Sequence, residues 1–314
     1  MTTSIPARPY AAAHFALELD PNKGSIGMFR SIEGGSIKAD VMSYQNGTSY
    51  DRWRQLGKPK FEDIKIQVGM SMSPPFYEWI EAFFSGEVLR KDGAIIAADF
   101  NYVERARREF TQALIKELTF PKLDATDKNP AYMNVAMAVE GIVFKPGGGT
   151  KITNTNSGDP MQAQLWTACN FRFRLDGFEK ECTRVSKIDS FTVKQNIIEY
   201  HAGGARAPTK IPSQIDFPQL SFYVPEVDAG KFLEHYDKRA VRGEATPSRL
   251  TGMIETFDLE RRTLFTMSFA GADIANVTFD KSDAGSEEIK QVKIDLYTES
   301  MKFDYKKVST PPIR

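Results

Sequence analysis

The residue types that most often carry catalysis are sparse in this sequence and follow no catalytic pattern. The three histidines, His14, His201 and His235, have no partner at the spacing of a triad or a metal site. No G-x-S-x-G, H-E-x-x-H, G-x-G-x-x-G or Walker pattern occurs. His235 falls on a predicted helix where the first half of the chain has Trp79, which favours a packing or surface role. The sequence therefore predicts no enzyme, no cofactor and no metal site.

Two further features that resemble chemical motifs have simpler readings. Cys169 and Cys182 are the only cysteines, and neither belongs to a C-x-x-C pair. We expect packing thiols, and neither a disulfide framework nor a zinc site. The stretch GGGTK, residues 147–151, lacks the spacing of a phosphate-binding loop and is typical of a surface loop.

The side chains best suited to binding lie in two polar stretches of 18 residues, Tyr44–Phe61 and Tyr200–Phe217. Each is too long for a tight hairpin, so we expect loops over 45–60 and 201–216. The first stretch gathers the aromatic and guanidinium groups that are enriched at interface hot spots. Composition alone does not separate an assembly loop from a mobile surface loop. The candidate assembly residues are Tyr50, Arg52, Trp53, Arg54, Leu56, Lys58, Arg206 and Lys210.

The two stretches belong to a longer internal repeat. The segment HFALELDP at 14–21 recurs as NFRFRLDG at 170–177, at a separation of 156 residues. Between Phe15 and Ile80 this separation gives 11 identities over 66 positions, where ordinary composition gives roughly four by chance. Apolar positions stay apolar where identity is lost, as in Ile64 and Leu220. A tandem duplication follows.

The repeat resumes after a gain of three residues. Leu118–Phe120 matches Val277–Phe279 at a separation of 159, and Glu140 matches Glu299. Between the copies, Lys145–Pro160 is rich in Gly, Asn, Thr and Ser, as linkers are. We therefore expect a first domain over 1–145, a linker over 146–164 and a second domain over 165–314.

Apolar residues in each copy alternate with period two, which indicates antiparallel strands with one wet face. Phe15, Leu17 and Leu19 alternate with Ala16 and Glu18 in this way. The ambiguous segment 103–118 is expected to be a strand beginning near residue 110. Many strands without long helices between them predict a mainly β protein made of two barrel or sandwich domains.

Each copy also contains one segment with helical spacing. In the first copy Ser73 stands where a helix cap is expected, and Gly86 stands at the stop. In the second copy Asp228 takes the place of the cap. The pattern predicts one helix in each domain.

Charge and hydropathy exclude several classes of protein. Lys plus Arg and Asp plus Glu number 41 each, so no bulk charge points to nucleic acid or to an anionic membrane. The sequence contains no signal-peptide run and no apolar stretch of the roughly 20 residues that a membrane span needs. We expect a soluble protein made in the cytoplasm, with no membrane partner.

The ordered series of motifs resembles a known family. FALELD, SIEGGSIKADVMSYQNG and LGKPKFEDIKIQVGMSMSPPFYEWI follow one another in the first copy. Together they resemble the tail tube proteins of contractile phages and phage-derived injection systems, which share the fold of the type VI secretion tube. The likeness covers residues 10–145 well and 165–305 more faintly.

The resemblance implies a structural protein that assembles into rings, and rings that stack into a hollow tube. Two domains per chain would let three chains close a ring with pseudo-six-fold symmetry. Implied partners are sheath, baseplate or terminator proteins, with DNA or protein cargo in the lumen. The assembled location would be a virion tail or an injection particle. A repeating tube subunit and a one-ring adaptor at the baseplate or terminator both fit.

A reading from a different class is a two-domain β-sandwich that binds carbohydrate or protein. Tyr44, Tyr50 and Trp53 would then form an aromatic platform for the ligand. A stable monomer that binds a sugar or peptide would distinguish this module from a tube subunit.

Overall fold

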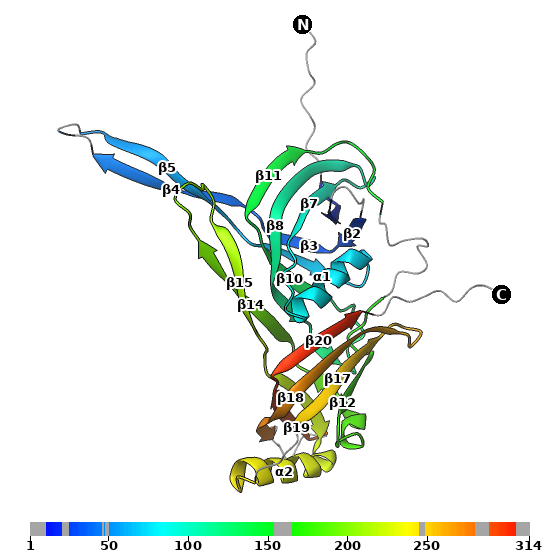
Figure 1. The fold of residues 1–314 in the computed structure, drawn as a ribbon. Helices are drawn as coiled ribbons and strands as arrows, with labels where there is room; N and C mark the ends of the chain where they lie inside the picture. The colour runs from blue at the N-terminus through cyan, green and yellow to red at the C-terminus, as the bar shows by residue number, and fades with distance from the viewer. Residues whose placement is uncertain are drawn as a thin grey trace.

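The computed structural model describes residues 11–20, 25–45, 47, 50–153, 165–244, 249–279 and 289–305. It confirms the expected mainly β fold: each half of the chain is a curved sheet with one α-helix (Figure 1). We call the described residues up to 153 the first half and those from 165 the second half. The predicted linker, 146–164, begins within a strand of the first half, and residues 154–164 lie outside the described residues.

The first half contains one helix and the strands up to β11. Its elements are β1 His14–Leu19, β2 Ser25–Phe29, β3 Ser31–Gly34, β4 Ile37–Gln45, β5 Arg52–Phe61, β6 Ile64–Val68, α1 Pro74–Phe84, β7 Lys91–Ala98, β8 Glu104–Phe120, β9 Leu123–Asp124, β10 Met133–Ala138 and β11 Gly141–Pro146. Its main sheet runs in the order β2-β1-β7-β8-β10-β6-β3, with β11 also on β8. The described pairings are antiparallel.

The second half contains the remaining strands, one α-helix and three short helical turns. Its elements are β12 Phe171–Leu175, a 3-10 turn Glu181–Arg184, β13 Lys187–Ile188, β14 Phe191–Tyr200, β15 Thr209–Asp216, β16 Leu220–Pro225, a 3-10 turn Glu226–Asp228, α2 Gly230–Tyr236, a π turn Asp237–Val241, β17 Leu250–Phe257, β18 Thr263–Phe279, β19 Gln291–Tyr297 and β20 Ser300–Tyr305. The sheet order is β12-β17-β18-β19-β16-β13-β9, with β20 also on β18.

The pairings of the second half repeat those of the first, residue for residue. Phe15 faces Ala97 in the β1–β7 ladder, and their counterparts Phe171 and Thr256 face each other in β12–β17. The β8–β10 ladder skips one residue between Ile115 and Glu117. The β18–β19 ladder skips one at the same place, between Ile274 and Asn276. Both halves thus share one strand order and one register.

The two halves also repeat a packing detail, a glycine at the same position of each sheet. A Cβ on Gly93 would lie 2.6 Å from the ring of Phe110, and a Cβ on Gly252 would lie 2.5 Å from the ring of Phe269. In each half the aromatic ring occupies the space that a side chain would need. Any larger residue at Gly93 or Gly252 would force the long central strand away from its neighbour.

Two details of the strands differ from the sequence prediction. Strand β8 begins at Glu104, six residues before the expected start, because Ala106 to Glu109 pair on both sides with β7 and β11. Strand β1 has no wet face: Ala16 and Glu18 are buried along with Leu17. Arg107 donates to Glu18, so an ion pair satisfies the carboxylate that alternation had placed in water.

The two helices are also only partly as expected. Ser73 is the N-cap residue of α1 and Gly86 follows its end with φ +76°, as predicted, although the Ser73 side chain makes no cap hydrogen bond. Asp228 does not cap α2, which begins at Gly230 after Ala229. The Asp228 carboxylate instead pairs with Arg184 at 2.5 Å, because the 3-10 turn ahead of α2 points it there.

The halves share one hydrophobic core. Phe120 at the end of β8 stacks on Phe191 with ring centroids 5.0 Å apart, and it lies 6.0 Å from Phe265. Phe84 of α1 stacks on Phe303 of β20 at 6.1 Å. The helix of the first half is therefore covered by the last described strand of the second half.

Candidate assembly interface

The first predicted loop is a long β-hairpin, so the expectation of a loop over 45–60 is wrong. Strands β4 and β5 pair from Ile37–Phe61 out to Gln45–Arg52 and project far from the body of the first half (Figure 1). The β4 side chains are exposed throughout, on both faces of the ribbon. Such a ribbon has no apolar side, so the alternation that marks half-buried strands is missing from its sequence. We call it the first arm.

The second predicted loop, 201–216, is likewise half of a hairpin, which we call the second arm. Strands β14 and β15 pair from Lys194–Asp216 to Tyr200–Thr209. Every pair repeats a pair of the first arm, and both ladders carry an irregularity at the same place, between Ala39 and Val41 and between Gln195 and Ile197. The arms are therefore built alike, and only their surroundings differ.

The candidate assembly residues divide between the two arms. Arg52, Trp53, Arg54, Leu56 and Lys58 are exposed on β5, with Tyr50 exposed just before it. Trp53 sits across the ribbon from Tyr44, with ring centroids 6.3 Å apart. Arg206 is exposed at the end of the second arm.

Lys210 is the exception among the candidates, because it is 5% exposed. The Lys210 peptide N–H donates to Glu140 at 2.7 Å, and Arg90 donates to the Lys210 carbonyl at 2.6 Å. Arg90 also pairs with Glu140 at 2.7 Å, while the Lys210 ammonium lies 3.5 Å from Asp63. The second arm is thus clamped at Lys210 onto the first half.

The clamp residues Arg90, Glu140 and Asp63 were not among the sequence candidates. They come from three separate places in the chain, and only the fold brings them to Lys210. The recurrence of Glu140 as Glu299 is the sequence signal that marks one of them. Lys116 also reaches Asp63 at 2.7 Å, and this bond raises the pKa of Lys116.

The base of the second arm is a β-pairing between the halves. Strand β14 adds to β8, with Thr192 opposite Thr119 and Val193 opposite Leu118. The two threonine hydroxyls lie 2.9 Å apart, so their side chains share one face of the sheet. Val193 and Leu118 are completely buried. This pairing, the clamp and the shared aromatic rings together form what we call the closed joint.

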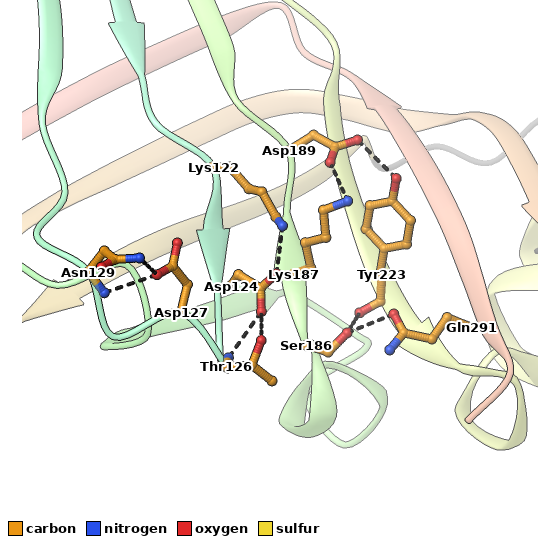
Figure 2. A network of polar contacts seen from close by, with 10 residues as sticks. All are labelled: Lys122, Asp124, Thr126, Asp127, Asn129, Ser186, Lys187, Asp189, Tyr223 and Gln291. Atoms are coloured by element: carbon orange, nitrogen blue, oxygen red, sulfur yellow. Dashed lines mark hydrogen bonds and ion pairs between the residues drawn. The ribbon is translucent and has the colours of Figure 1, made fainter. Parts of the chain in front are cut away.

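A second pairing extends the closed joint by two residues. Strand β9 pairs with β13, and the Ala125 N–H donates to the Ser186 carbonyl at 2.9 Å. Asp124 accepts from Lys122 at 2.7 Å and from both the hydroxyl and the N–H of Thr126 (Figure 2). These bonds lower the pKa of Asp124 to about 2, so its carboxylate is ionised at any ordinary pH.

The arms also touch each other. The Lys58 ammonium donates to the Ala205 carbonyl at 3.1 Å. Lys60 pairs with Asp40 across the first arm at 2.6 Å, which raises the pKa of Lys60. The first arm thus meets the end of the second arm through one lysine, while most of its side chains stay exposed.

Histidines and cysteines have structural surroundings. His14 stacks on Tyr102 at 3.9 Å, and His235 bonds to Asp273 at 2.9 Å. Cys169 and Cys182 are both free, and burial raises the pKa of Cys182 to about 12. Among the described residues, no group of three or more His, Cys, Asp and Glu is arranged to hold a metal ion.

In the described part of the chain, none of the helices has the length and apolar character needed to cross a membrane.

Comparison with solved structures finds chains that match a little under half of this chain. A chain of the extracellular contractile injection system PVC sheath-tube complex has 19% identity and a TM-score of 0.38, and the match covers 45% of this chain and 94% of that one. The anti-feeding prophage tube terminating cap has 23% identity and a TM-score of 0.39, covering 47% and 99%. Hcp1 from Flavobacterium johnsoniae has 17% identity and a TM-score of 0.27, covering 45% and 99%.

Comparison of the sequence with protein families gives one match, and no curated protein matches significantly. The matching model describes the T4-like virus tail tube protein gp19 and aligns with residues 11–143. This range holds the strands of the first half from β1 to β10, together with α1 and the first arm. Residues 11–143 of this chain, somewhat less than half of it, are therefore similar to the T4-like virus tail tube protein gp19.

Proposed function

We propose that this chain is a structural subunit of a phage tail or of a phage-derived contractile injection system, built from two tail-tube-like domains by tandem duplication. One observation carries the proposal: the half that matches the tail tube family is repeated in register by the second half, including its arm. The boundaries we propose are 1–145 for the first domain and 165–314 for the second.

The physical task of such a subunit is to form a rigid wall and not to catalyse a reaction. Open sheet edges and projecting ribbons pair without control in a monomer, whereas a closed ring satisfies each edge with a neighbour. Three chains would supply six near-equivalent domains, giving a ring with pseudo-six-fold symmetry. Stacked rings would enclose a hollow conduit.

The free parts of the first arm suit contacts between rings. Tyr50, Arg52 and Trp53 lie near its end, far from the body of the first half, and they combine aromatic and guanidinium groups. Sheath, baseplate or terminator proteins are the partners that such a tube would meet. The cargo of the conduit would be DNA or protein, and the assembled location a virion tail or an injection particle.

Light scattering and negative-stain electron microscopy of the purified chain test the proposal. We expect particles with the mass of three chains, six-lobed rings in projection, and rods at higher concentration. A chain that stays monomeric at every concentration and binds a sugar or peptide array would contradict the tube and favour the binding module. Rings that never stack would favour a one-ring adaptor over a repeating tube subunit.

A further inference from the structure

We propose that the first arm of one chain docks onto the second half of the next copy, and that this contact reproduces the closed joint. The inference rests on the proposed ring and goes further, because it names the strands, the register and the clamp that join one chain to the next. Each residue of the closed joint has a counterpart in the other half of the chain, 156 or 159 residues away.

The closed joint depends on a free strand edge. Strand β7 covers one side of β8 only as far as Ala113, while β11 and β10 cover the other side. Beyond Ala113 the uncovered side of β8 is taken by β14, over Glu117 to Phe120. The second arm therefore continues the sheet where β7 leaves it.

The second half has the same edge without a partner in the described structure. Strand β17 covers one side of β18 only as far as Ala272, and β20 and β19 cover the other side. Asn276 to Phe279 therefore have one described neighbour, β19. Phe279 is 54% exposed, whereas its counterpart Phe120 is 3% exposed.

The first arm has the matching free side. In the second arm, β14 pairs with β15 on one side and β8 on the other, whereas within the described residues β4 pairs with β5 alone. Ile37 of β4 is 41% exposed, whereas its counterpart Val193 is fully buried. The same apolar position is therefore buried in the second arm and exposed to water in the first arm.

The clamp is present in the second half as well, but in the described part of the chain it holds no arm. Arg249 and Glu299 correspond to Arg90 and Glu140 and form an ion pair in the same way. Their side chains are 60% and 50% exposed, against 26% and 18% for Arg90 and Glu140. The counterpart of the clamped Lys210 is Arg54, one of the exposed residues of the first arm.

The geometry of the closed joint fixes the contacts between chains. Glu299 of one copy accepts from the Arg54 peptide N–H of the next, and Arg249 donates to the Arg54 carbonyl. Strand β4 extends β18 antiparallel, with Ser36 opposite Thr278, Ile37 opposite Val277 and Lys38 opposite Asn276. The Ser36–Thr278 pair repeats, in hydroxyl chemistry, the Thr119–Thr192 pair of the closed joint.

The proposed contact is not an exact copy of the closed joint. Asp63, which receives the Lys210 ammonium, is replaced by Gln219, and Lys116 by Ala275. The contact between chains therefore carries fewer charges than the joint within a chain. Such an interface is satisfied by peptide pairing and one clamp, in which Glu299 is the carboxylate beside the two cations Arg249 and Arg54.

Paired cysteines test the register directly. Ser36→Cys with Thr278→Cys would place two thiols on directly opposed residues of adjacent strands, at a separation that a disulfide spans. Mild oxidation of the assembled full-length protein should give covalent dimers and trimers on a non-reducing gel. The matched control is Thr119→Cys with Thr192→Cys, which should form its disulfide within one chain and migrate as a monomer.

Further controls separate this bond from chance collisions. Each single cysteine variant should stay monomeric on the gel, which shows that Cys169 and Cys182 do not take part. Val143→Cys with Thr278→Cys places an exposed residue of β11 outside the proposed contact, and it should give no covalent oligomer above the single-variant level.

The outcomes distinguish this inference from the proposed function. Covalent trimers from Ser36→Cys/Thr278→Cys alone support the contact. Rings seen by microscopy with no cross-link in that variant would overturn the contact and leave the tube standing. Monomers at every concentration, with an intact Thr119→Cys/Thr192→Cys disulfide, would overturn both.

A clamp variant gives a second, independent measurement. Glu299→Ala should weaken ring formation at least about tenfold in sedimentation experiments, because Arg249 and the Arg54 N–H of the next copy both lose their acceptor. Its melting curve as a monomer should match that of the native chain, since Glu299 is exposed there. Unchanged ring formation in Glu299→Ala would contradict the clamp.

Discussion

The first and second arms share a register and an irregularity, yet one is docked and the other is largely bare. At equivalent positions Lys210 is buried and Arg54 is exposed. The strand structure of an arm therefore depends on its own peptide pairing, and its burial depends on what lies beside it. A repeated element that is buried once and exposed once points to a partner for the exposed copy.

The largest expected difference between the docked and bare positions concerns Phe120 and Phe279. Phe120→Ala should lower the free energy of unfolding by about 3–5 kcal/mol, because it leaves a cavity among the stacked rings of the core. Phe279→Ala should lower it by less than about 0.5 kcal/mol in the monomer. Chemical denaturation of both variants at a dilute, monomeric concentration measures the difference. Equal losses of unfolding free energy in the two variants would contradict the difference between the docked and the bare position.

The two clamps give the next largest effect. Glu140→Ala should cost about 2 kcal/mol, since it removes a charged acceptor from Arg90 and from the Lys210 N–H. Glu299→Ala in the monomer should cost less than about 0.5 kcal/mol. Equilibrium unfolding in urea provides the measurement: the midpoints of the variants are compared where the dependence of the unfolding free energy on urea is unchanged. A Glu299→Ala monomer as unstable as Glu140→Ala would show that its clamp already serves the isolated chain.

The pH dependence of Asp124 sharpens the account of the closed joint. Its folded pKa of about 2 lies below the ordinary 3.8, so its stabilisation is complete above that ordinary value and is lost as the pH falls through about 2. Asp124→Asn should therefore cost about 1 kcal/mol near neutral pH, after allowance for solvent screening. The cost should shrink toward zero at about pH 2. A cost that is constant with pH would assign the effect to packing and not to charge.

The smallest expected effect on the monomer is that of Trp53. Trp53→Ala should leave the unfolding midpoint unchanged within about 0.5 kcal/mol, because the ring lies on a bare ribbon beside Tyr44. The same change should shorten the rods seen by electron microscopy if the arm makes contacts between rings. Rods of native length would remove Trp53 from the proposed stacking surface.

Much of the fold follows from the sequence, because burial leaves a periodic record. The repeated apolar positions of β6 and β16, such as Ile64 and Leu220, are buried in equivalent ladders. The arms could not be recognised in this way, since a ribbon that is wet on both faces carries no alternation. The clamp could not be predicted from the sequence either, because Arg90 and Glu140 meet Lys210 only after strands far apart in the chain have paired.

The contrast between Lys210 and Arg54 lies beyond local sequence for a related reason. Both are basic residues at the same register position of a polar hairpin. Whether such a residue is buried depends on the neighbouring domain and not on its own segment. The sequence places both on an interaction surface, and only the folded chain separates the occupied surface from the free one.

The packing of α1 beneath β20 has a consequence for synthesis. Phe84 finds its cover in Phe303, and Tyr77 finds its cover in Tyr305, which are made more than two hundred residues later. During synthesis, α1 therefore exposes an apolar face until the last strands emerge from the ribosome. The nascent chain is prone to aggregation during that interval. Premature termination after the linker should yield inclusion bodies rather than a smaller working subunit.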